Sequence, residues 1–196
     1  MISSLSKKIT EHLISTNVIG YEDFDLYNYG FFILFSEIFL FVYCLIVGAI
    51  LKIILPIILF YVFFFVAHRF AGGVHVKTEL HCQTITLLFF LVGIVAIKQS
   101  SLINYGILNV IYVICAVLLV IFSPADTPQK PLSNKEKTLF KKITSLIVIV
   151  AFIAIVILSK KNMNIYASAI IVAIVLQTIS VICGRLFNKR LLSNNT

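Results

Sequence analysis

Six apolar segments, separated by short polar stretches, constrain this chain more than any other feature of its sequence. They run roughly over residues 31–50, 53–67, 84–97, 103–122, 143–158 and 165–183. A helix needs about 20 residues to cross the hydrocarbon layer, with a range of about 17–25. The second and third segments are short, and we expect them to extend into the polar stretch between them, or the membrane to thin there. The sequence therefore predicts an all-α integral membrane protein with about six transmembrane helices.

The composition excludes an ordinary soluble domain. Hydrophobic residues make up 60% of the 196 residues and charged residues 12%, and the mean hydropathy is +1.06. Soluble chains carry about 45–50% apolar and about 25% charged residues. The net charge of +8 does not indicate nucleic-acid binding, because the basic residues form short clusters between apolar segments, as in membrane proteins. We expect membrane lipid as a partner and no nucleic acid.

An amphipathic helix is predicted ahead of the six segments. Apolar residues recur there at helical spacing, at Ile2, Leu5, Ile9 and Leu13. Such a helix lies on the membrane surface, although a solvated helix is the alternative. We therefore expect a single membrane-embedded domain over 1–196. It comprises an interfacial helix within 1–20, a transmembrane bundle over 31–183 and a cytoplasmic tail over 184–196.

The distribution of Lys and Arg predicts the orientation in the cell membrane. With a cytoplasmic N-terminus, four of the sixteen basic residues face outward: Lys52, Lys98, Lys160 and Lys161. The other twelve face the cytoplasm, which is a clear positive-inside bias. Both termini, the polar stretch 68–82 and the loop 123–142 are then cytoplasmic, and the two polar loops on one side suggest a single site there.

The stretch from His68 to Cys82, HRFAGGVHVKTELHC, gathers ionisable groups between apolar segments. Ionisable residues at a bilayer are costly and indicate a functional site. His75, Glu79 and Cys82 stand at i, i+4 and i+7, which places them on one face of a continuous helix. This pattern favours Cys82 as a nucleophile, His75 as its base and Glu79 as a possible orienter of the imidazole.

A straight helix cannot hold His75 and Cys82 together. Seven residues at a rise of about 1.5 Å separate them by about 10.5 Å, whereas a nucleophile and its base need about 2.6–3.2 Å. The pair Gly72-Gly73 permits positive φ angles, so we expect a break in the helix that folds His75 back toward Cys82.

Other interpretations of these residues remain open at this point. His81 is an alternative base, but helical residues i and i+1 do not face each other. Glu79 is equally compatible with a solvated carboxylate, and His68 with the interfacial end of a span. Arg69 suits a substrate carboxylate or a membrane anchor. Three histidines and a cysteine also suit a metal, but their spacing matches no common zinc pattern, so we expect neither metal nor cofactor.

The remaining cysteines lie inside apolar segments, at Cys44, Cys115 and Cys183. A free thiol there behaves as a small hydrophobic group. We expect packing roles for all three.

The chain resembles the accessory gene regulator B (AgrB) family of membrane cysteine endopeptidases, which process quorum-sensing propeptides. The resemblance rests first on a pattern R-x-A-G-G-x-H-x6-C, carried by Arg69, Ala71, Gly72, Gly73, His75 and Cys82. A second match is the segment 124–131, PADTPQKP, which is similar to the family's proline, aspartate and lysine segment after the fourth span. Length, the N-terminal helix and the hydropathy profile agree over essentially the whole chain.

The resemblance implies a function and a site. His75 and Cys82 match the family's catalytic pair, and we expect Arg69, Gly72, Gly73, Asp126 and Lys130 to bind substrate. The implied substrate is an AgrD-like propeptide with an amphipathic leader, a signal segment and an acidic tail. Cys82 would remove the tail, hold the signal as a thioester and pass it to a thiolactone or lactone ring. The basic loop 130–142 is expected to attract the tail, and the family forms homodimers.

Two other function classes compete with this interpretation. A small transporter or peptide permease also has several spans, and usually places ionisable residues or broken helices near the midplane. Glu37 and Pro56 are the only acidic residue and the only proline within apolar segments. A membrane scaffold leaves the polar stretch unexplained. For a dimer, Ala169 and Ala173 form a short small-xxx-small pattern, which occurs often by chance.

Overall fold

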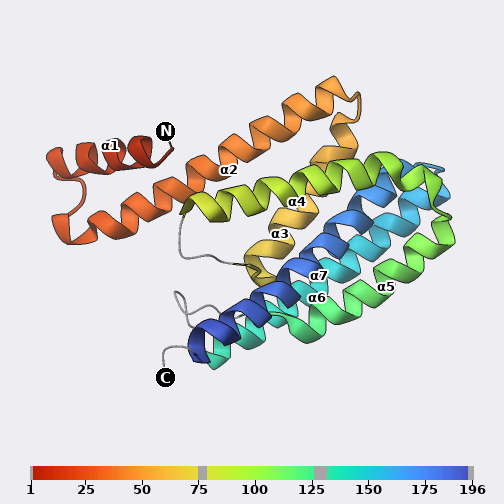
Figure 1. Cartoon of the computed structure of the whole chain (residues 1–196). Helices are drawn as coiled ribbons and strands as arrows, with labels where there is room; N and C mark the ends of the chain where they lie inside the picture. Colours follow the sequence, from red (N-terminus) through yellow and green to blue (C-terminus); the bar gives the residue numbers. More distant parts are fainter. Residues whose placement is uncertain (1, 75–78, 126–131, 194–196) are drawn as a thin grey trace.

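The computed structural model describes residues 2–74, 79–125 and 132–193, with the backbone alone for 79–83 and 187–193. Seven α-helices lie in this part of the chain, which contains no strand (Figure 1). Their bounds are α1 Ile2–Ser15, α2 Phe24–Ile50, α3 Ile54–Ala71, α4 Glu79–Gln99, α5 Tyr105–Phe122, α6 Asn134–Lys160 and α7 Asn164–Ser193. Single 3-10 turns, η1 Tyr21–Asp23 and η2 Ser100–Leu102, precede α2 and follow α4.

Six of these helices are long and apolar enough to cross a membrane, which confirms the predicted fold class. The two short segments are completed as expected, because α3 continues to Ala71 and α4 begins at Glu79 inside the polar stretch. The fifth segment also gains length, because α6 starts at Asn134 behind a capping box formed by Ser133 and Glu136. That cap supplies hydrogen-bond partners for backbone amides at the start of a polar first turn.

Helix α7 is the central helix of the bundle. About 72% of its membrane-spanning window is buried, against 11–33% for the other five. Small residues allow this close approach of neighbouring backbones, and Ala167, Ala169 and Ala173 are fully buried. One core cluster joins α7 to α3, α5 and α6, and a second joins it to α2, α3 and α4. Ala169 and Ala173 therefore serve packing within the chain, so the pattern considered for a dimer interface is used internally.

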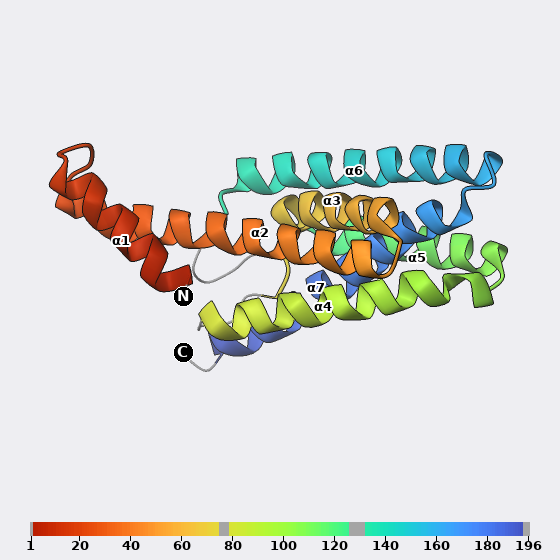
Figure 2. The same ribbon diagram turned by 90° about the horizontal axis from the view of Figure 1, so that it is seen from above.

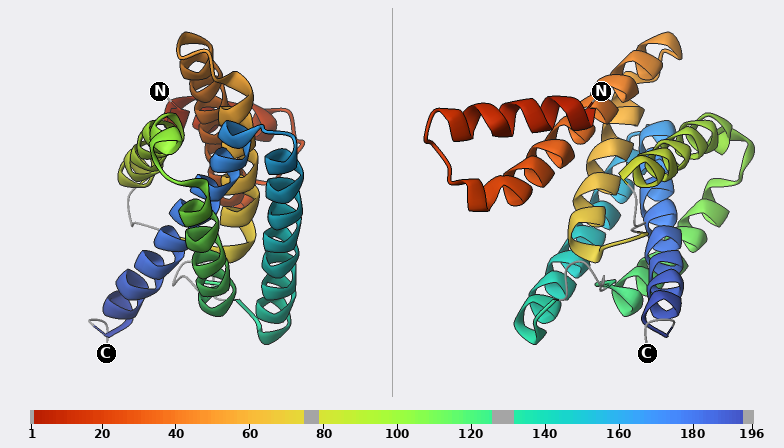
Figure 3. Two further views of the ribbon diagram at one scale, coloured as in Figure 1. Left: turned by 90° about the vertical axis from the view of Figure 1, so that its right-hand side faces the viewer. Right: turned by 60° about the vertical axis from the view of Figure 1, so that its left-hand side comes forward.

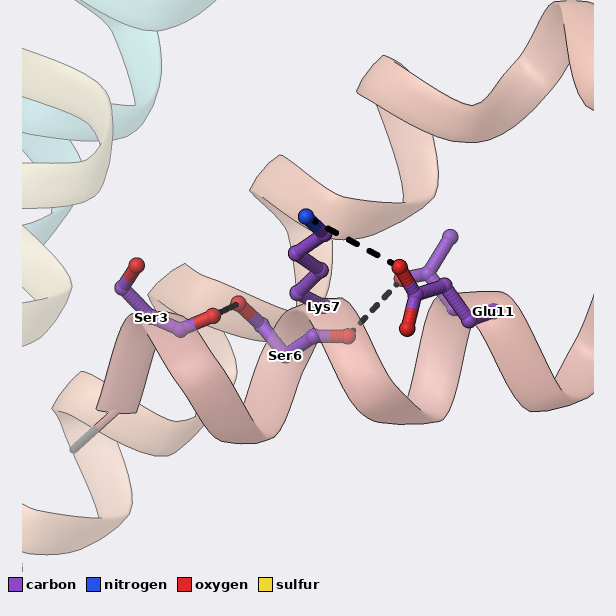
Figure 4. Close-up of polar contacts among 5 residues, drawn as sticks. Ser3, Ser6, Lys7 and Glu11 are labelled. Atoms are coloured by element: carbon purple, nitrogen blue, oxygen red, sulfur yellow. Dashed lines mark hydrogen bonds and ion pairs between the residues drawn. The ribbon is translucent and has the colours of Figure 1, made fainter.

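Helices α1 and α2 form an arm beside the other helices (Figures 1 and 3). The amphipathic helix predicted for the N-terminus is α1, whose residues Ser6 and Thr10 are buried. Leu5 of its apolar face is 46% exposed. Figure 4 shows Lys7 paired with Glu11 at 3.8 Å and the Ser6 hydroxyl donating to the carbonyl of Ser3. An exposed i,i+4 pair contributes little to stability. Ile2, Ile9 and Leu13 of the apolar face are only partly buried, which fits a helix on a membrane surface.

The helix ends divide into two groups along the bundle (Figures 1 and 2). The end of α3, the start of α4, the end of α5, the start of α6 and the end of α7 lie toward one end (Figure 1). The turns from α2 to α3, from α4 to α5 and from α6 to α7 lie toward the other. The two polar loops singled out in the sequence therefore emerge at the same end, as expected.

Candidate functional site

The predicted helix break is present at the Gly-Gly pair. Helix α3 ends at Ala71, and Gly72 follows with φ +74° and ψ −165°, a region that is essentially open to glycine alone. A β-carbon on Gly72 would lie 2.7 Å from the carbonyl oxygen of Ala125. Both the backbone conformation and the available space therefore require glycine at this position.

The proposed nucleophile lies just beyond this break. Cys82 is the fourth residue of α4, which begins at Glu79. Helix α4, which carries Cys82, thus follows the break at Gly72.

Several predicted site residues lie outside what the structure describes. His75, Asp126 and Lys130 belong to segments 75–78 and 126–131, and the side chains of Glu79 and Cys82 are not described. His81 is the third residue of α4, and its side chain is not described either. The choice between His75 and His81 as the base therefore remains a prediction.

A backbone hydrogen bond joins the two polar loops. The amide of Ala125 donates to the carbonyl of Ala71 at 2.8 Å, and Ala125 is itself buried in the core cluster formed with α7. Arg185, near the end of α7, donates to the carbonyl of Pro124 at 3.4 Å and lies over the Phe122 ring. The segment that carries the second sequence motif thus meets the Gly-Gly loop directly.

Polar residues of α7 contact the same loop, and sequence reasoning missed them. Gln177 is fully buried, bonds the ring of His68 and donates to the carbonyl of Gly72. Ser180 accepts from the amide of Val74. His68 therefore faces a buried partner, rather than only marking the end of a span. The available signal was a glutamine within the sixth apolar segment, since polar groups in a membrane are costly.

Arg69, Glu37 and the three other cysteines lie on the helices, some exposed and some buried. Arg69 is exposed near the end of α3. Glu37 of α2 is partly buried, and its backbone carbonyl accepts from the Tyr61 hydroxyl at 3.3 Å. Cys44 is buried in the core as predicted, and Cys115 and Cys183 are partly buried free thiols.

Comparison with known proteins identifies one family. The family model of accessory gene regulator B matches residues 6–181. Similar curated proteins include a putative AgrB-like protein of Clostridium beijerinckii, 28% identical over 61% of this chain and 59% of that protein. The accessory gene regulator protein B of Staphylococcus haemolyticus is 30% identical over 46% of this chain and 50% of its own length. A putative AgrB-like protein of Clostridium perfringens is 26% identical over 81% of this chain and 77% of its own length.

The matches to the first two relatives thus span about half to three fifths of their lengths. No solved structure matches this chain.

Proposed function

Because the chain belongs to the accessory gene regulator B family, we propose that it is a membrane-embedded cysteine endopeptidase that processes a quorum-sensing propeptide. The observation that carries the proposal is the backbone break at Gly72, which separates α3 from α4, the helix that carries Cys82. A cysteine with a nearby histidine is the usual composition of an activated thiol nucleophile. We assign Cys82 as nucleophile and His75 as base.

The reaction proceeds in two acyl transfers. The Cys82 thiolate attacks the carbonyl carbon that joins the signal segment to the tail, and the carbon–nitrogen bond breaks. The tail leaves as an amine with a proton from His75, and the signal stays as a thioester on Sγ. A thiol within the signal then attacks this thioester, His75 takes its proton, and the ring closes as Cys82 is released. A serine in place of that thiol would give a lactone.

Ring closure must compete with hydrolysis of the thioester. Exchange of one thioester for another is nearly balanced in energy, so the outcome depends on excluding water from the site. A site at the edge of the apolar bundle supports that requirement, because the loop before His75 packs against buried residues of α7. Glu79 stands as a possible orienter of the base.

Basic residues near the site suit an acidic substrate tail. Four lysines lie in the first three turns of α6, at positions Lys135, Lys137, Lys141 and Lys142. Helix α6 begins at the same end of the bundle as α4 (Figure 1). Such a cluster attracts negative charge over a range set by ionic strength. We assign this surface, together with Lys130, to the tail, and Arg69, Gly72, Gly73 and Asp126 to the rest of the substrate around the cleaved bond.

The proposal includes a location and partners. Both termini and the site face the cytoplasm, as the bias of twelve basic residues against four indicates. The substrate is an AgrD-like propeptide, and the protein acts in the cell membrane as a homodimer. A peptide permease has less support, because Pro56 lies in the first turn of α3, where proline does not break a helix.

Mass spectrometry of a propeptide co-expressed with this protein tests the proposal. The expected products are the free tail and a leader–signal fragment lighter than its linear form by one water, the loss that ring formation requires. The Cys82→Ala variant is the matched control and should leave the propeptide intact. Recovery of an intact propeptide with the wild-type protein, or of cleaved propeptide with Cys82→Ala, would contradict the assignment.

A further inference from the structure

Helix α7 contacts the loop before His75 through three residues on one stripe. Gln177, Ser180 and Gly184 are spaced at i, i+3 and i+7, which places them on one face of a helix. All three are buried, although α7 is otherwise strongly apolar. Each meets the backbone of the segment 72–74, which leads directly into His75.

Gln177 holds two groups at once. Its Nε2 donates to the carbonyl oxygen of Gly72 at 2.6 Å, and its Oε1 lies 3.2 Å from Nδ1 of His68. The Gly72 carbonyl can only accept, so the amide nitrogen must face it and the amide oxygen must face the imidazole. His68 therefore carries a proton on Nδ1 and donates it to Gln177. The side chain of Gln177 thus links the end of α3 to the first residue of the loop.

Ser180 and Gly184 hold the next two residues of the loop. The Ser180 hydroxyl accepts from the amide of Val74 at 3.3 Å. A β-carbon on Gly184 would overlap the carbonyl group of Gly73 and approach the amide of Val74. Those are backbone atoms, which cannot rotate away as a flexible side chain can. Gly184 therefore brings the loop into direct contact with the helix backbone.

We propose that Gln177, Ser180 and Gly184 are positioning residues that set the loop before His75, and through it the geometry of the catalytic pair. This inference rests on the proposed function. The three residues touch neither substrate nor reacting atoms in this assignment, and they act through the backbone of Gly72, Gly73 and Val74. Hydrogen bonds between membrane helices contribute little to stability on average, so the effect is expected in catalysis rather than in folding.

The neighbouring residue on α7 provides a matched control. Thr178 is also buried, but its hydroxyl lies within hydrogen-bond distance of two other carbonyls, that of Cys115 on α5 and that of Ile174 one turn back on α7. Thr178→Val removes a buried polar group from the same turn of α7 without touching the loop. A loss of activity caused by general weakening of α7 would therefore appear in Thr178→Val as well.

The experiment measures two properties in full-length protein in membranes. The first is propeptide cleavage, separated into kcat and KM. The second is the pH dependence of Cys82 alkylation by iodoacetamide. It is measured in a variant that carries Cys44→Ala, Cys115→Ala and Cys183→Ala, so that Cys82 is the one remaining thiol. Alkylation follows the thiolate, and a histidine beside a thiol lowers its pKa below the ordinary value of about 8.5. The alkylation midpoint therefore reports whether the base lies beside Cys82.

Gln177→Leu and Ser180→Ala should each lower kcat by about 10-fold to 100-fold with little change in KM, since a small displacement of a catalytic group costs about 10²-fold. Both should also shift the alkylation midpoint upward, while Thr178→Val changes neither property. Wild-type kcat and midpoint in Gln177→Leu, or equal losses in Thr178→Val, would overturn the proposal. If the Gln177→Leu protein does not accumulate in the membrane, the kcat and alkylation midpoint of Ser180→Ala test the proposal by the same criteria.

His75→Ala separates this inference from the proposed function. If His75→Ala leaves the alkylation midpoint unchanged, the assigned catalytic pair is wrong. If His75→Ala shifts the midpoint and Gln177→Leu does not, the pair stands and the positioning role of α7 is wrong.

Discussion

The backbone amide of Ala125 donates a hydrogen bond to the carbonyl of Ala71 at 2.8 Å. Fifty-four residues separate the two in the sequence, and each lies at the edge of one of the two motifs that distinguish this chain. A β-carbon on Gly72 would meet Ala125 as well. The described starts of the two motifs therefore contact each other at one end of the bundle, and a change in either one is expected to affect the other.

Replacement of Cys82 should abolish cleavage without preventing membrane insertion. Cys82→Ala has no nucleophile, and Cys82→Ser has a hydroxyl that is far less reactive than a thiolate. Cleavage is measured by mass spectrometry and insertion by recovery in the membrane fraction. Cys183→Ala and Cys115→Ala are matched controls and should retain activity, because those thiols are partly buried packing groups. Full cleavage by Cys82→Ala would exclude the cysteine mechanism.

His75→Ala should lose as much activity as the cysteine variants, and His81→Ala should keep most of it. A general base contributes about 10²–10⁴-fold to a rate. On α4, His81 is adjacent to Cys82 and does not share its face. Initial rates of propeptide cleavage distinguish the two. An inactive His81→Ala together with an active His75→Ala would reverse the assignment of the base.

Cys82 should react with thiol reagents from the cytoplasmic side. In a background with Ala at 44, 115 and 183, a membrane-impermeant reagent should label Cys82 in inverted vesicles and not in intact cells. The control places a cysteine at the opposite end of the bundle, as Lys161→Cys in the exposed turn between α6 and α7. This control should label in intact cells. The reverse pattern would overturn the orientation derived from the positive-inside bias.

Alanine at Gly72 should impair cleavage more than alanine at Gly73. Gly72→Ala forces a side chain into a backbone region that costs about 1–3 kcal/mol and places its β-carbon against the Ala125 backbone. The nearest atoms to a β-carbon on Gly73 belong to the side chains of His68 and Ser180 rather than to backbone, and Gly73 has no positive φ angle. Cleavage rates at equal membrane abundance test this order.

Gly30→Ala is the matched control for both glycines. No atom lies within 4 Å of its added β-carbon, and alanine favours the helix. Gly30→Ala should keep the wild-type rate. A wild-type rate in Gly72→Ala would contradict the requirement for glycine at the helix break.

The sequence alone determined the class of fold and the place of the break. Six long apolar segments leave little choice other than membrane helices, since hydropathy is a property of each segment by itself. Gly72 and Gly73 between two such segments were sufficient to predict where α3 ends, because backbone freedom is also local. The residue pattern around Cys82 was likewise sufficient to indicate the family.

Only the tertiary structure decided which helix is central and what holds the loop. All six spans look alike in hydropathy, and the burial of α7 depends on which faces meet in three dimensions. Ala169 and Ala173 illustrate this point. Their small-xxx-small pattern is compatible with a dimer interface, but both residues pack inside the bundle. Gln177 bonds Gly72 across 105 positions of sequence. Such pairings follow from helix packing and not from local sequence pattern, so only the tertiary structure shows the contact between α7 and residues 72–74.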